Sequence, residues 1–95
     1  MNTFDKMVAF AKKRFVDATA EDHLEKLKIE ADEASKDLTD ISEFADCLLA
    51  LYAAAGKAGH TEGQLNSAAE QKFKILKKRK WEKLPGKGIY QHKPD

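Results

Sequence analysis

The stretch that decides the fold is "ISEFADCLLALYAAAG", residues 41–56, which is apolar almost throughout yet contains Glu43 and Asp46. A helical projection places both acids on a side shared with alanines, which let another helix approach closely. Burying a carboxylate is costly unless it is paired or binds a metal, so the two acids need partners. The opposite side of the projection carries a bulky stripe: Ile41, Phe44, Leu48, Leu51 and Tyr52.

Partners for these acids are expected one helix earlier, where Glu30 and Glu33 project from one side of a helix. The short interval before Glu43 suits a helical hairpin that places the two pairs opposite each other. Four converging carboxylates would repel, and divalent cations would make the cluster stable. All-oxygen ligation selects Mg²⁺ or Mn²⁺ over zinc. The alternative is a solvated acidic face, because pairs such as Asp22/Glu25 have the same spacing.

Periodicity and capping residues predict an all-α, four-helix bundle-like domain at residues 1–83, followed by a turn-rich C-terminal tail at 84–95. Thr3 is the expected N-cap of the first helix, and Thr19 with Asp22 forms a capping box for the second. Gly59 is expected to end the third helix in a left-handed conformation. Within the tail, "GIYQH" is the one candidate for a short extended piece. The helices are predicted at 4–18, 20–36, 40–57 and 62–81.

The composition predicts one small soluble domain, with 95 residues, 42% hydrophobic and 35% charged. No apolar run reaches the roughly 20 residues of a membrane span, and no signal-peptide pattern is present. The single Cys47 excludes an internal disulfide and a Cys-rich zinc site. We therefore expect a cytoplasmic protein without a membrane partner. Because so short a chain buries only a modest core, we expect a second subunit to supply the missing burial.

The charges are segregated along the chain. Residues 21–46 carry ten of the 16 acidic groups against three lysines, and residues 72–93 carry nine of the 17 basic groups. This distribution suits a site that binds both a cation and an anion. Two solvated faces that attract each other would give the same pattern.

The spacing E-x-x-E at 30–33 followed by E-x-x-D at 43–46 resembles the MazG-like all-α nucleoside triphosphate pyrophosphohydrolases. "HLEKLKIEADEA" (23–34), "EFADCLLALYAAAGKAG" (43–59) and "EQKFKILKKRKW" (70–81) look like the small phage and bacterial members. The resemblance extends over about residues 23–92.

This resemblance implies hydrolysis of a (deoxy)nucleoside triphosphate to monophosphate and pyrophosphate by a metal-activated water. It implies that Glu30, Glu33, Glu43 and Asp46 are the catalytic residues and the Mg²⁺ ligands, with Mn²⁺ as a substitute. It also implies a homodimer or a dimer of dimers. A preference for deoxypurine triphosphates is an analogy with related phage proteins.

Five further residues match positions that similar proteins use for substrate. Lys72 and Arg79, two helical turns apart, are expected to contact phosphates. Trp81 is expected to stack on the base or to anchor the end of the helix by packing. His23 and His92 complete the substrate-binding set, although a histidine at the start of a helix also fits a surface position. Leu76 stands where relatives often have Asn, a departure that affects affinity or specificity if that Asn contacts metal or substrate.

Two other function classes fit parts of the sequence. "KFKILKKRKWEK" has seven basic residues in twelve, which suits a nucleic-acid-binding module without catalysis. The acidic middle of the chain would repel DNA, so nucleic acid is an improbable partner. The chain could also form a structural or regulatory oligomer whose buried acids pair with lysines. That interpretation predicts that metal does not change the stability of the fold.

Overall fold

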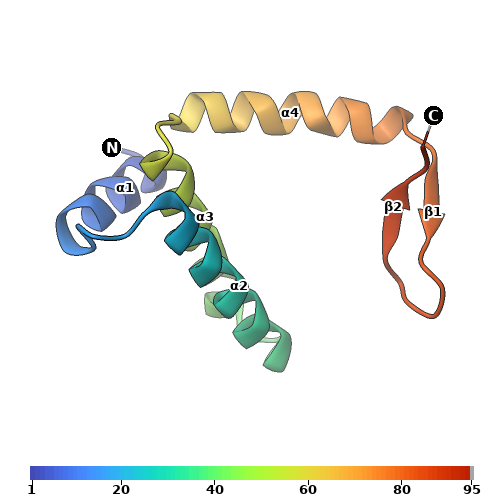
Figure 1. The fold of residues 1–95 in the computed structure, drawn as a ribbon, viewed down its shortest axis with the longest axis horizontal. Coiled ribbons are helices and arrows are strands. Elements are labelled where there is room, and N and C mark those ends of the chain that lie inside the picture. The colour runs from blue at the N-terminus through green and yellow to red at the C-terminus, as the bar shows by residue number, and fades with distance from the viewer. Residues whose placement is uncertain (95) are drawn as a thin grey trace. The chain divides into compact units, whose positions relative to one another are not determined.

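The structure is a computed structural model that describes residues 1–94, which form four helices and one two-stranded antiparallel sheet (Figure 1). The predominance of helix confirms the all-α prediction. The chain divides into two compact units, Met1–Leu65 and Asn66–Asp95. The boundary predicted at residues 83 and 84 falls within the second unit and stays a prediction. The elements are α1 (Thr3–Arg14), α2 (Ala20–Lys36), α3 (Ile41–Lys57), α4 (Glu62–Lys78), β1 (Trp81–Lys83) and β2 (Tyr90–His92).

In the first unit, α3 is the central helix, because both α1 and α2 pack against it. Four residues, 37–40, connect α2 to α3, and so short a connection makes neighbouring helices antiparallel. Figure 1 shows this hairpin with α1 beside it. The tight hairpin predicted between the two acidic pairs is therefore present.

The core of this unit is made mainly of small side chains. Ala50, Ala53 and Ala54 of α3 are buried. Gly56 is packed so closely that an added Cβ would collide with the side chain of Val8 on α1. The prediction that the small-residue side of α3 admits other helices is confirmed. The remaining buried apolar residues among those described are Phe4, Ala11 and Ala34.

The bulky stripe of α3 faces outward in the single chain. Ile41 is 80% exposed, and Phe44 and Leu48 are nearly half exposed. Tyr52 is the exception, since its ring contacts Phe4 edge-on at 5.1 Å between centroids. Backbones approach closely only over small residues, so the alanine side meets α1 and α2 and leaves the large side chains uncovered.

The ends of α1 differ from the prediction. Asn2, not Thr3, is the N-cap, and its side chain accepts a hydrogen bond from the Asp5 N–H at 2.8 Å. The helix ends at Arg14 rather than at 18. The Ala18 N–H donates to the Phe15 carbonyl at 3.0 Å, which turns the chain toward the α2 N-cap at Thr19.

The other predicted helix ends are largely confirmed. Thr19 and Asp22 form both hydrogen bonds of the capping box at the start of α2. Gly59, with φ 98°, follows α3, and the His60 and Gly59 N–H groups donate to the carbonyls of Ala55 and Gly56. These paired bonds define a Schellman motif, in which glycine is favoured because φ is positive.

The end of α4 and the tail were predicted only in part. The helix ends at Lys78 instead of 81, and the chain then forms a hairpin in which Trp81 pairs with His92 and Lys83 with Tyr90. Within "GIYQH", Tyr90–His92 forms a strand, as predicted, but Trp81, the first residue of its partner strand β1, was predicted to end the helix. The turn between the strands contains Gly86, whose φ is 71°. No helix within residues 1–94 is long and apolar enough to cross a membrane.

Candidate functional site

Three of the four predicted carboxylates come together between α2 and α3. Glu30, Glu43 and Asp46 each offer a carboxylate oxygen, and these oxygens all lie within 4.8 Å of one another. Glu30 comes from the middle of α2, whereas Glu43 and Asp46 come from the first two turns of α3. The antiparallel hairpin is therefore what brings together acids 13 and 16 positions apart in the sequence.

The start of α3 is fixed by a local cap, which sets the position of Glu43. The Asp40 carboxylate accepts hydrogen bonds from the Ser42 N–H at 2.9 Å and from its hydroxyl at 2.6 Å. These bonds lower the pKa of Asp40 below its usual value. An ionised N-cap is stabilised by the N–H groups of the first turn. Glu43 thus lies in the first turn of a firmly capped helix.

The cluster is electrostatically unfavourable as a group of bare acids. Partial burial raises the pKa of Glu43, and the negative charges of Asp40, Asp46, Glu30 and Glu33 raise it further. Glu30 is largely covered, with 16% of its side chain exposed, and forms an ion pair with Lys26 at 3.0 Å between Nζ and Oε1. One ammonium therefore offsets part of the negative charge.

Glu33 is placed apart from this cluster. It is exposed, and it is not among the acids whose oxygens converge. It is still near enough for its charge to raise the pKa of Glu43. The predicted set of four is thus present as three converging carboxylates and one peripheral carboxylate.

The chemistry of these residues fits a hard divalent cation. Carboxylate oxygens are the ligands that Mg²⁺ and Mn²⁺ prefer, and mutual repulsion among three such groups is relieved when a cation is shared. The side chain of the single cysteine, Cys47, is not a member of the cluster. The donor set therefore does not favour a thiophilic metal such as zinc.

A hollow of about 280 Å³ adjoins the cluster, and Glu30 and Asp46 contribute to its wall. This volume is close to the lower end of the range for small-molecule sites. The rings of Phe10, Phe15 and His23 line the same hollow. Phe15 lies between the other two rings, at 5.5 Å from Phe10 and 6.4 Å from His23.

His23 is therefore not the surface residue that a position at the start of a helix suggested. It is 7% exposed and packs against the Phe15 ring. Sequence reasoning did not single out Phe10 and Lys26, which also line this hollow. The position of Lys26 four residues before Glu30 was the available signal for the ion pair, because such pairs meet on a helix surface.

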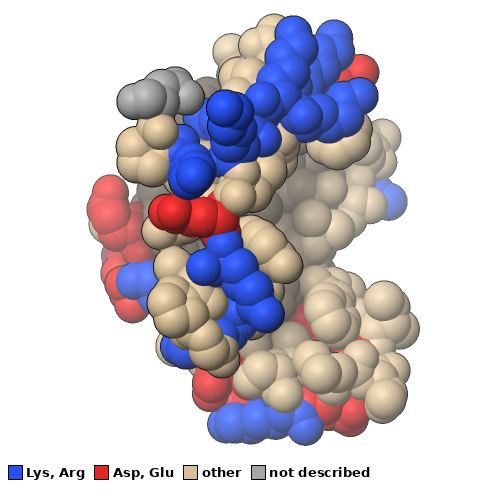
Figure 2. Space-filling view, turned by 90° about the vertical axis from the view of Figure 1, so that its right-hand side faces the viewer, with Lys and Arg blue, Asp and Glu red and all other residues tan. Residues whose placement is uncertain are grey.

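The predicted anion-binding residues belong to the second unit. Lys72 is exposed on α4, and Arg79 follows the last turn of that helix. Arg79 lines a hollow of about 660 Å³ with Lys78, Lys80 and Lys93. Figure 2, which looks at the hairpin end of α4, shows Lys and Arg side chains gathered there.

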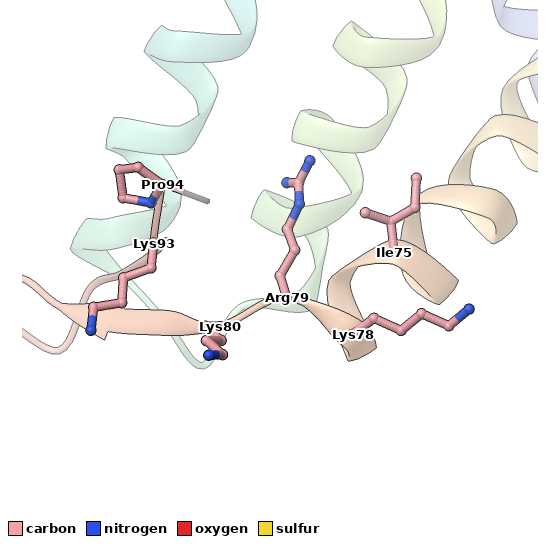
Figure 3. A pocket seen from close by; sticks show the side chains of 6 residues that line it. All are labelled: Ile75, Lys78, Arg79, Lys80, Lys93 and Pro94. Atoms are coloured by element: carbon pink, nitrogen blue, oxygen red, sulfur yellow. The ribbon is translucent and has the colours of Figure 1, made fainter.

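The side chains of this basic hollow point in different directions. Figure 3 shows Arg79 extending to one side of the backbone, as Ile75 does, and Lys80 and Lys93 extending to the other. Arg79 therefore extends away from Lys80 and Lys93.

Trp81 and His92 are brought together by the hairpin, as partners in the β1–β2 register. The Trp81 indole N–H donates to the Leu76 carbonyl at 3.0 Å, so the ring anchors β1 to the end of α4. The ring is nevertheless 42% exposed. The packing alternative considered for Trp81 is thus present, and part of its side chain stays exposed.

Comparison with known proteins gives a family. The family model described as dATP/dGTP pyrophosphohydrolase matches residues 3–91, which include the three converging carboxylates, Glu33 and the ring-lined hollow. No curated protein and no solved structure matches the chain. The match agrees with the MazG-like resemblance read from the two acidic motifs. The chain therefore belongs to the dATP/dGTP pyrophosphohydrolase family, whose members are hydrolases that act on phosphoric anhydrides.

Proposed function

We propose that this enzyme hydrolyses dATP and dGTP to the deoxynucleoside monophosphate and pyrophosphate, at a metal centre built on Glu30, Glu43 and Asp46. The observation that carries the proposal is the convergence of their oxygens within 4.8 Å, in a chain that matches the family over residues 3–91. Mg²⁺ is the proposed cation, and Mn²⁺ is a substitute.

Each carboxylate has a distinct part in this proposal. Glu30, Glu43 and Asp46 hold the cation, which when bound neutralises phosphate charge and lowers the pKa of a water. Glu33 lies outside the converging group and is exposed. Its carboxylate is thus available to accept the proton of the attacking water. The capped start of α3 keeps Glu43 and Asp46 in place, so little reorganisation is needed when substrate binds.

Substrate contacts are proposed within each unit separately. His23 contacts the nucleoside within the hollow that Glu30 and Asp46 also line. Lys72 and Arg79 bind phosphate oxygens, for which a guanidinium offers two parallel donors. Trp81 and His92, paired across the hairpin, are proposed as further nucleotide contacts. The net positive charge of the segment after residue 65 supports an anionic ligand.

We also propose that the active form is a homodimer or a dimer of dimers in the cytoplasm. The support is the outward stripe of α3, where Ile41, Phe44 and Leu48 are exposed in the single chain. Large apolar side chains in one contiguous row on a helix are typical of a surface that another subunit covers.

The test is hydrolysis of a panel of dNTPs and NTPs with and without Mg²⁺, with the products identified by ³¹P NMR. The proposal predicts Mg²⁺-dependent release of monophosphate plus pyrophosphate from dATP and dGTP. Asp46→Asn should remove this activity, whereas the matched control Asp32→Asn, an exposed α2 acid paired with Lys36, should retain it. Release of diphosphate plus phosphate, or equal activity in both variants, would contradict the proposal.

A further inference from the structure

Lys26 is the residue whose position the proposed function does not explain. Its ammonium lies 3.0 Å from the Glu30 carboxylate, and Glu30 is one of the three converging acids. Lys26 also lines the hollow that Glu30 and Asp46 share with the rings. A cation of the chain itself thus contacts a carboxylate that we assign to the metal.

We propose that Lys26 is an internal counter-ion that leaves Glu30 when the metal binds and then binds the phosphate oxygens of the substrate. This inference rests on the proposed function, because it takes Glu30 as a ligand of the metal. It adds a substrate-binding residue on α2 and a coupling between metal and nucleotide.

Without metal, the cluster concentrates negative charge. Three carboxylates within 4.8 Å repel one another, and a single ammonium in contact with Glu30 reduces that repulsion. Glu30 is only 16% exposed, so water screens its charge poorly, whereas 58% of the Lys26 side chain is exposed. Lys26 can therefore reach and leave Glu30 at little cost in packing.

A divalent cation and the Lys26 ammonium are not compatible on the same carboxylate. A divalent cation bound by Glu30 would repel an ammonium held at hydrogen-bond distance from the same group. Lys26 has a flexible four-carbon stem. Moving its ammonium away from the metal and onto the nearest unpaired anion therefore lowers the free energy of the complex. A triphosphate that shares the metal with Glu30 would present such an anion within reach of the side chain.

Asp22 is an alternative anion for Lys26 on the same helix. Asp22 and Lys26 line a second hollow together. The Asp22 carboxylate already accepts the Thr19 N–H at 3.0 Å as part of the capping box, which lowers its pKa. Asp22 is thus less available than a triphosphate with several unpaired oxygens. The released ammonium is expected to favour the phosphate.

This arrangement couples the binding of metal to the binding of nucleotide. If Lys26 opposes metal binding and favours phosphate binding, each ligand increases the affinity of the other. Metal alone binds weakly, and the metal centre fills most readily when nucleotide arrives to take the ammonium.

The test measures Mn²⁺ binding by electron paramagnetic resonance, first alone and then with a non-hydrolysable α,β-methylene dATP. A protein-free titration corrects for metal bound by the analogue itself. Lys26→Met is compared with the matched control Lys28→Met. Lys28 forms an ion pair of the same length, 3.0 Å, with Glu25 on the same helix. The side chains of both Lys28 and Glu25 are well exposed.

We expect Lys26→Met to bind Mn²⁺ alone more tightly, on the order of fivefold, and to bind the analogue more weakly by a similar factor. Lys28→Met should change either affinity by less than about twofold. An unchanged or weaker Mn²⁺ affinity in Lys26→Met would show that Lys26 supports Glu30 instead of competing for it. That outcome, or an unchanged analogue affinity, would overturn the inference.

The two proposals fail in different ways. If the parent chain binds no Mn²⁺, the metal centre of the proposed function is wrong, and the role of Lys26 fails with it. If the parent chain binds Mn²⁺ and Lys26→Met behaves like Lys28→Met, only the role of Lys26 is wrong.

Discussion

The first 65 residues and the segment after them differ in both charge and packing. The first unit carries thirteen acidic against eight basic side chains, and it contains every buried residue that the structure describes. The second carries nine basic against three acidic side chains, and none of its described residues, 66–94, is buried. The proposed metal ligands therefore sit on a packed scaffold, and the proposed phosphate ligands sit on an exposed helix and hairpin. The comparison predicts that mutations in the first unit affect both fold and catalysis, whereas those in the second affect binding with little loss of stability.

The largest effect is expected from a metal ligand. Glu30→Gln keeps the size of the side chain but removes the charge, and it should lower kcat/KM for dATP by more than about 100-fold, because even residues that only orient metal ligands cost up to that factor. Steady-state hydrolysis measures the loss. Glu25→Gln, an exposed acid on the same helix, should stay close to the parent. Equal losses in both variants would contradict the placement of the site.

The packing of the first unit is tested at Gly56. Gly56→Ala adds a Cβ against Val8, 2.7 Å from its Cγ1, so α1 must move away from α3. We expect the free energy of unfolding to fall by about 1–3 kcal/mol. The control Gly63→Ala in α4 meets no atom within 4 Å and should be neutral or stabilising by up to about 1 kcal/mol. Urea denaturation measures the free energy of unfolding of both variants. Equal values for Gly56→Ala and Gly63→Ala would show that the α1–α3 contact is loose.

The second unit is tested at Arg79. Arg79→Ala should raise KM for dATP by about tenfold, the value of a hydrogen bond to a charged group, and leave the unfolding midpoint nearly unchanged. Lys74→Ala, on the opposite face of α4 from Lys72, is the control for a general loss of positive charge. If the control raises KM as much as Arg79→Ala does, the second unit acts through its net charge and not through a specific contact.

The smallest effect is the pH dependence that Glu43 confers. Its raised pKa means that the metal-free folded chain keeps this proton to a higher pH than the unfolded chain does. The folded state then binds more protons within that window, so stability falls as pH rises through it. Glu43→Gln should lessen this fall in stability. The measurement is the melting temperature of both chains as a function of pH, from below pH 4.5, the ordinary pKa of glutamate, up to neutral pH. An unchanged pH profile would show that the metal-free cluster carries no such repulsion.

Much of the first unit could be predicted from sequence because its signals are local. Capping residues Thr19 and Asp40, the glycine at 59 and the alternation of bulky and small residues on α3 specify helices and a hairpin directly. The convergence of Glu30 with Glu43 and Asp46 then follows from spacing and a short connection. Glu33 was grouped with them by the E-x-x-E spacing and by the family resemblance, and neither shows how close its carboxylate comes to those on α3.

The rest depends on contacts distant in the sequence. His23 is buried because Phe15, beyond the end of α1, packs against it, and nothing in the local pattern of α2 indicates that. Trp81 was predicted as the end of the helix, but it begins strand β1, which pairs with β2 from nine residues further along the chain. The ion pair of Lys26 was visible in the spacing, but its meaning depends on Glu30 belonging to the cluster.

The most direct test of the metal centre is the effect of substoichiometric Mn²⁺ on the amide resonances of the ¹⁵N-labelled chain. Paramagnetic broadening should centre on the amides around Glu30 in α2 and around Glu43 and Asp46 in α3, and Asp46→Asn should reduce it. Broadening centred on Asp22 and Glu25, on Asp37 and Asp40, or on the second unit would contradict the account.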